Sequence, residues 1–81
     1  MSFGKKLYEL RKQKGLSEED LAVDLNISQS SISNYEQNFT KPDIVFLEKV
    51  SLYFKIPIED FLQDIVLLIT VTRIKPYKMV Q

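Results

Sequence analysis

Cysteine and histidine are both absent from the 81 residues of this chain, and glycine occurs only twice. Without cysteine the chain can form neither a disulfide nor a thiolate metal site, which fits a reducing compartment. Without histidine it lacks the commonest general base, the commonest metal ligand and any histidine-based triad. We therefore expect no enzymatic activity, no metal and no cofactor.

Long apolar runs are missing as well. The longest, at residues 65–69, is far below the roughly 20 residues needed to span a bilayer. The N-terminal lysines have no long apolar stretch behind them, so they do not form a secretory signal peptide. We expect a soluble, cytoplasmic protein with one modest core, because a chain this short buries only about 60% of its unfolded surface.

Neither sign of charge is in excess, since 11 basic residues balance 11 acidic ones. A net charge of zero argues against a non-specific binder of polyanions. The charges are nonetheless grouped along the sequence. Residues 1–15 are mainly basic, residues 16–27 are acidic, and residues 73–78 carry a second basic cluster. Solvated helix faces explain most of this pattern, so any anion-binding role depends on where a few basic side chains lie.

Apolar spacing and capping residues predict an all-α fold. Phe3, Leu7 and Leu10 form one stripe of a first helix, which Gly15 ends. Ser17 caps a second helix, with acidic residues in its first turn facing the positive end of the helix dipole. Its buried face is predicted to contain Leu21, Ala22 and Leu25.

Three further helices are expected. Ser28 caps the third, which runs to about residue 36 with Ile32 and Tyr35 inward. Pro42 and Asp43 begin the fourth, and residues 57–62 form the fifth, which packs Phe61 and Leu62. The predicted inner face of the fourth helix consists of Ile44, Leu47, Val50, Ser51 and Phe54.

Residues 65–74, IVLLITVTRI, break the helical pattern. β-Branched residues dominate this segment, which favours a strand. A solitary strand leaves its backbone groups unpaired, so it needs a partner. Continuation of the fifth helix through Leu68 is the alternative.

The second and third helices have the features of a helix-turn-helix. They are joined by a three-residue turn at residues 26–28, and the small Ala22 lies where they cross. The turn needs a residue that tolerates a left-handed backbone, which Asn26 can do. Ile27 is expected to tuck back into the core.

Residues 4–62 resemble the phage-repressor/Cro-type helix-turn-helix family. The features that carry the resemblance are LRKQKGLSEEDLA (10–22), the turn at 26–28, SSISNYE (30–36) and KPDIVFLEKVSLYFKIPIEDFL (41–62). The resemblance implies a five-helix repressor-like domain, which we place at residues 1–63. Residues 64–81 then form a C-terminal extension, which we expect to provide a dimerisation strand and a basic tail. The resemblance also implies double-stranded operator DNA as the partner, with the third helix in the major groove.

The resemblance assigns two sets of DNA contacts. The base-reading set would be Gln29, Ser30, Ser33 and Asn34. Glutamine and asparagine suit the N6 and N7 edge of adenine, whereas serine is less selective. The phosphate-binding set would be Ser28, Ser31, Asn38, Thr40 and Lys41.

The resemblance also implies a structural pair, Arg11 with Glu36, although two unrelated surface charges would give the same sequence. The chain departs from the family at two places. Glu18 stands where a glutamine commonly binds phosphate, and a carboxylate there repels phosphate. Residues 37–39 lack the usual loop glycine; we expect Phe39 to plug the core, the alternative being an exposed apolar contact.

Apolar residues outside the predicted core favour self-association. Together they leave too large an apolar surface for a monomer, which suggests a homodimer whose two 65–74 segments pair as an antiparallel sheet. Alternatively, the segment docks another protein, such as a toxin, or folds back on its own domain. The candidate dimer residues are Val45, Leu52, Tyr53, Ile65, Leu67, Ile69 and Val71.

Two functions remain open. The polar third helix favours a sequence-specific DNA-binding transcriptional regulator, most often a repressor in this family. Zero net charge, Glu18 and the missing loop glycine favour a protein-interaction module or antitoxin-like partner that binds DNA weakly or not at all.

Overall fold

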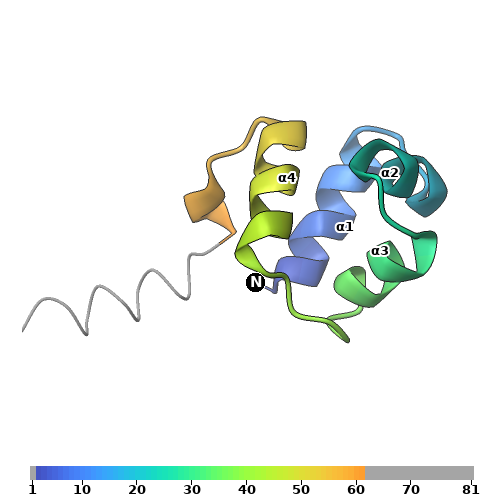
Figure 1. The fold of residues 1–81 in the computed structure, drawn as a ribbon. Coiled ribbons are helices and arrows are strands. Elements are labelled where there is room, and N and C mark those ends of the chain that lie inside the picture. Colours follow the sequence, from blue (N-terminus) through green and yellow to red (C-terminus); the bar gives the residue numbers. More distant parts are fainter. Residues whose placement is uncertain (1, 62–81) are drawn as a thin grey trace, which may run out of the picture.

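The computed structural model describes residues 2–61, which form a small helical domain (Figure 1). The α-helices are α1 (Phe3–Gln13), α2 (Glu18–Leu25), α3 (Gln29–Glu36) and α4 (Ile44–Phe54). A 3₁₀ turn, η1 (Ile58–Asp60), follows α4. The all-α class is confirmed for this part of the chain, which contains no strand. The strand predicted at residues 65–74 lies outside the described residues.

The prediction of a fifth α-helix is wrong. Residues 58–60 make a single 3₁₀ turn, closed by bonds from Asp60 N to Pro57 O and from Phe61 N to Ile58 O, both 3.0 Å. No side chain caps this turn, so its first N–H groups lack the partner that a longer helix normally gains at its start.

Each α-helix begins at a side-chain cap, and the starts predicted at Ser17, Ser28 and Asp43 are confirmed. The fourth cap is Ser2, before α1. At α2 the bond is reciprocal: Ser17 Oγ accepts from Asp20 N at 3.0 Å, and Asp20 Oδ2 accepts from Ser17 N at 3.2 Å. This capping box satisfies two backbone donors and fixes where α2 starts.

Left-handed residues set the turns between the helices. Gly15 (φ 70°) and Asn26 (φ 58°) have the conformation predicted for them. Asn38 (φ 63°) and Lys55 (φ 57°) adopt it as well. Asn38 therefore takes the backbone conformation that a loop glycine would otherwise supply.

The core is built where α1, α2, α3 and α4 meet. Leu7, Leu21, Ile32 and Val50 are fully buried. The predicted inner face of α4 is partly wrong: Ile44 is 56% exposed, whereas Phe46 is 5% exposed. Residues 44–47 are all apolar, so spacing alone could not choose between them. The choice is made by the aromatic contact of Phe46 with Tyr35, whose rings stack with centroids 4.0 Å apart.

Phe3 extends this contact into an aromatic cluster beneath α3. Its ring centroid lies 6.2 Å from that of Tyr35, 6.0 Å from that of Phe46 and 5.8 Å from that of Phe61, in edge-on arrangements. The cluster joins the start of α1 to α3, α4 and the residue after η1. Within residues 2–61, each helix is too short or too polar to cross a membrane.

Candidate nucleic-acid interface

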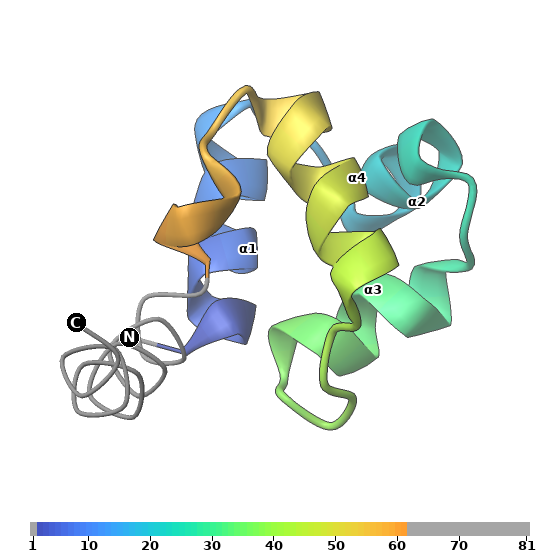
Figure 2. The ribbon, with the colours of Figure 1, turned by 60° about the vertical axis from the view of Figure 1, so that its left-hand side comes forward.

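The turn between α2 and α3 holds these helices side by side at one end of the molecule (Figures 1 and 2). Asn26 in this turn is left-handed, and the next residue, Ile27, donates its backbone N–H to Ala22 O at 2.9 Å. Ala22 is 4% exposed, so its small side chain lets α2 pack closely on its neighbours. The helix-turn-helix predicted from the sequence is confirmed.

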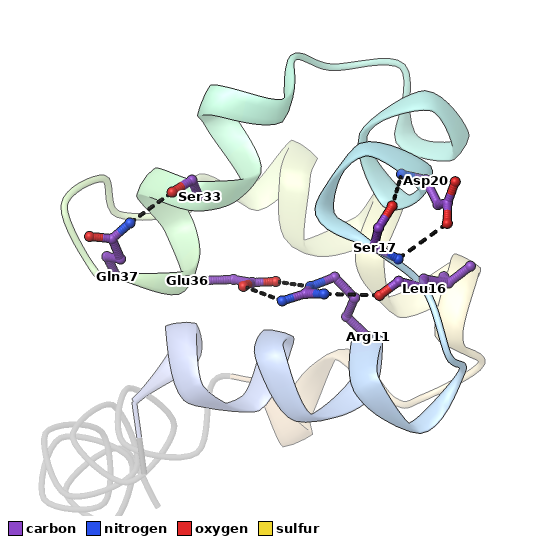
Figure 3. A network of polar contacts seen from close by, with 7 residues as sticks. All are labelled: Arg11, Leu16, Ser17, Asp20, Ser33, Glu36 and Gln37. Atoms are coloured by element: carbon purple, nitrogen blue, oxygen red, sulfur yellow. Dashed lines mark hydrogen bonds and ion pairs between the residues drawn. The ribbon is translucent and has the colours of Figure 1, made fainter.

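α3 buries its apolar residues and leaves a polar face outside. Ile32 is fully buried and Tyr35 packs against the core. Of the predicted base-reading set, Gln29, Ser30 and Asn34 are exposed. The fourth member, Ser33, is half-buried, and its Oγ accepts a hydrogen bond from Gln37 Nε2 at 2.7 Å (Figure 3).

The predicted phosphate set is only partly free to bind. Ser28 Oγ caps α3 by accepting from Ser31 N at 3.1 Å, and the two hydroxyls lie 2.9 Å apart. Asn38 is exposed, but its amide is already bonded to the start of α1: its Oδ1 accepts from Gly4 N at 3.1 Å, and its Nδ2 donates to Ser2 Oγ at 3.2 Å. Thr40 and Lys41 are exposed.

Arg11 and Glu36 form a buried, two-pronged ion pair (Figure 3). Arg11 Nε donates to Glu36 Oε2 at 2.6 Å, and Nη2 donates to Oε1 at 3.0 Å. A third nitrogen, Nη1, donates to Leu16 O at 2.9 Å. The side chains are only 8% and 6% exposed, and hydrogen bonding to Glu36 raises the pKa of Arg11 above its ordinary value. The pair therefore fixes the end of α3 against α1 and the α1–α2 turn.

Gly4 permits the close approach of α1 to α3, a role that sequence reasoning missed. A Cβ atom at this position would lie 2.4 Å from Glu36 O and 2.6 Å from Tyr35 O. Both are backbone atoms, so neither can rotate away. The signal available in the sequence was a glycine in the first turn of a helix, where it costs stability relative to alanine.

The prediction that Phe39 plugs the core is wrong, because the side chain is 75% exposed. Its backbone N donates to Asn34 O at 2.8 Å, directly after the left-handed Asn38. The space beneath α3 is already filled by Tyr35 and Phe46, which stack on each other.

A hollow of about 560 Å³ lies beside the start of α3. Two basic and two acidic side chains line it, so its formal charges balance. The lining residues are Arg11, Lys12, Gly15, Leu16, Ser17, Glu18, Glu19 and Gln29. Among residues 2–61 there is no group of three or more acidic side chains placed to hold a metal ion.

The candidate dimer residues on α4 fall into two groups. Val45 and Leu52 are 62% and 80% exposed. Tyr53, which the sequence placed with them, packs instead on the core, and its hydroxyl donates to Asp24 Oδ2. The remaining candidates, Ile65, Leu67, Ile69 and Val71, lie outside the described residues.

We expect the hydrogen bond from Tyr53 to Asp24 to make a pH-dependent contribution to the free energy of unfolding. The hydrogen bond to Asp24 is the main cause that raises the pKa of Tyr53 to about 12, against about 10 for an unperturbed tyrosine. Because the folded pKa is the higher one, the stabilisation is complete below pH about 10 and is lost between about 10 and 12. Tyr53→Phe should therefore lower the free energy of unfolding by about 1 kcal/mol at neutral pH.

Denaturant titrations of wild type and Tyr53→Phe at several pH values measure this contribution. The gap between the two proteins should close as the pH approaches 12. A gap of constant size across that range would contradict the assignment.

Comparisons with known proteins agree with a helix-turn-helix domain. A family model described as a helix-turn-helix domain matches residues 4–65. ImmR, an HTH-type transcriptional regulator of Bacillus subtilis (strain 168), is 38% identical over 56 residues, which cover 69% of this chain and 44% of ImmR.

Two solved structures of SinR are also similar. The crystal structure of SinR, the master regulator for biofilm formation, in complex with DNA has a TM-score of 0.67 at 36% identity and covers 74% of this chain and 97% of that one. The complex of the SinR and SinI proteins has the same TM-score and identity and covers 74% and 59%. The match spans about half the length of these two relatives, 44% of ImmR and 56% of SinR.

Proposed function

Because the chain belongs to the phage-repressor/Cro-type helix-turn-helix family, we propose that it is a sequence-specific transcriptional regulator, a repressor, that reads double-stranded DNA with α3 in the major groove. The observation that carries this proposal is the division of α3 into two faces. Ile32 is buried, while Gln29, Ser30 and Asn34 are exposed. SinR, which has a similar fold, has been crystallised with DNA.

Four of the exposed side chains have an assigned role in this proposal. Gln29 and Asn34 carry amides that pair with the N6 and N7 edge of adenine. Thr40 and Lys41 supply a hydroxyl and an ammonium group for phosphate, and their contacts make binding depend on salt. Ser33 contributes less, because its hydroxyl already accepts from Gln37.

Selection from a pool of random duplexes at low salt tests the function. We expect one enriched site, bound less tightly as salt is raised. A pool that yields no enriched sequence would contradict the proposal.

Glu18 is expected to weaken DNA binding, so its neutralisation should strengthen it. Glu18 is half-buried in the first turn of α2, and it lines the same hollow as Gln29. A carboxylate beside the reading face repels phosphate, and removing one such charge should gain about fivefold in affinity, equivalent to about 1 kcal/mol. Titration of the enriched duplex with Glu18→Gln measures this gain, which should shrink at high salt.

Glu59→Gln is the matched control. It makes the same change of charge in η1, which lies at the opposite end of the molecule from α2 and α3 (Figure 1). An equal gain in both variants would indicate a general effect of net charge, and no gain in Glu18→Gln would contradict the repulsion.

We also propose that the protein acts as a homodimer in which the domain at residues 1–63 is followed by a dimerisation segment at 64–81. The exposed Val45 and Leu52 on α4 support this, as does a mostly apolar hollow of about 470 Å³ lined by Ile44, Glu48, Ser51, Leu52 and Ile58. Two copies of α3 about 34 Å apart would enter successive major grooves. Sedimentation should give a dimer that Leu52→Glu weakens; a strict monomer at micromolar concentration would contradict this.

A second candidate function is that of a protein-interaction module. The exposed apolar side chains of α4 favour it, and SinR has also been solved in complex with the SinI protein. On this alternative, the random-duplex selection yields no site although the protein is folded.

A further inference from the structure

One aromatic side chain projects from the loop between α3 and α4. Phe39 is 75% exposed, and this loop extends past the end of α3 (Figure 2). Its neighbours Thr40 and Lys41 are exposed as well. An apolar ring therefore emerges beside a hydroxyl and an ammonium group, within a few residues of the reading face of α3.

The backbone of this loop is tied to the reading helix. Phe39 N and Thr40 N both donate to Asn34 O, at 2.8 and 3.4 Å. The exposed side chain of Asn34 belongs to the base-reading set, so the position of the ring is linked to that of a base-reading residue.

A second anchor lies on α1. The amide of Asn38 bonds to Gly4 N and to Ser2 Oγ, and Asn38 itself is left-handed. The loop is thus held at both helices, and the ring faces solvent without a flexible backbone behind it. A loop backbone that is already anchored loses little conformational freedom when a partner covers the ring.

Duplex DNA offers a surface with this alternation of chemistry. Its backbone presents phosphates, which suit Thr40 and Lys41, and between them deoxyribose rings, whose carbon atoms are apolar. An apolar ring on an anchored loop, beside an exposed hydroxyl and an exposed ammonium group, matches this surface.

We propose that Phe39 is a DNA-contact residue that packs on deoxyribose of the strand flanking the bases read by Asn34. This inference rests on the proposed function and deepens it. The contact is apolar and does not involve base edges, so it contributes affinity without sequence preference and without displacing counterions.

These properties give Phe39 its own signature among three variants measured on the selected duplex. Phe39→Ala should weaken binding about tenfold, since most of a phenylalanine side chain's burial is lost. It should leave both the base preference and the slope of log K against log salt unchanged. Lys41→Ala should reduce that slope by about 0.9, and Asn34→Ala should relax the preference at one base pair.

Two controls separate the contact from other effects. Val23→Ala truncates a similarly exposed apolar side chain on α2, 78% exposed, and should leave the affinity unchanged. Phe39→Leu should retain part of the affinity that Phe39→Ala loses, while both variants unfold at the wild-type denaturant midpoint.

The outcomes are distinct. If wild type binds the duplex and Phe39→Ala binds equally well, the inference is overturned and the proposed function stands. A reduced salt slope or altered base preference in Phe39→Ala also overturns it. If wild type enriches no duplex, the proposed function itself fails.

Discussion

Gly4→Ala should destabilise the domain by about 3 kcal/mol, at the upper end of what overpacking usually costs. The new methyl group would lie 2.4 Å from Glu36 O and 2.6 Å from Tyr35 O, and also 2.8 Å from Asn38 Oδ1. Since the first two atoms belong to the backbone of α3, relief requires α1 and α3 to separate. Separation would also break the bond from Gly4 N to Asn38 Oδ1 and loosen the aromatic cluster at Phe3.

Chemical denaturation of Gly4→Ala and Gly15→Ala provides a matched pair. Gly15 has open space around it but a φ of 70°, so alanine there should cost only about 1 kcal/mol through backbone strain. The two substitutions add the same atom, and their difference isolates the close approach of the helices. Equal stability of Gly4→Ala and wild type would contradict the packing described for α1 and α3.

Removing one partner of the Arg11–Glu36 pair should cost about 3–5 kcal/mol, because a buried charge is left without its counter-ion. Glu36→Ala leaves the guanidinium with Leu16 O as its remaining hydrogen-bond acceptor. Arg11→Lys should also be destabilising, since an ammonium cannot reproduce the two parallel bonds to the carboxylate. Thermal or denaturant unfolding measures both.

The double variant Arg11→Met/Glu36→Leu is the informative control. Replacing both charges by apolar groups removes the unpaired charge, so the double variant should be more stable than the sum of the single losses implies. Additive losses, or a Glu36→Ala protein as stable as wild type, would show that the pair does not act as a buried unit.

Local signals made much of this fold predictable. The caps at Ser17, Ser28 and Asp43 and the left-handed Asn26 depend on residues within a few positions of each other, so the sequence contains all their determinants. The polar face of α3 followed for the same reason, because burying Ile32 at its helical spacing leaves the opposite side exposed.

What could not be predicted depends on contacts between distant segments. The Asn38 amide is held against the start of α1 because Ser2 and Gly4, 36 and 34 positions away, supply its hydrogen-bond partners. With Tyr35 and Phe46 filling the space beneath α3, Phe39 is left outside. The face of α4 that is buried contains Phe46 instead of Ile44, and this likewise depends on the contact of Phe46 with Tyr35. Because Tyr35 lies outside α4, the spacing of apolar residues within 44–54 could not predict it.

Base-by-base affinity measurements on the selected duplex test most directly whether the exposed face of α3 reads DNA sequence. Substitution of each base pair that wild type reads should cost about 1–3 kcal/mol of its binding free energy. Asn34→Ala, which keeps the backbone bonds from Phe39 and Thr40 to Asn34 O, should become indifferent at one of these positions and remain selective at the others. Identical profiles for wild type, Asn34→Ala and Gln29→Ala would contradict this account of α3.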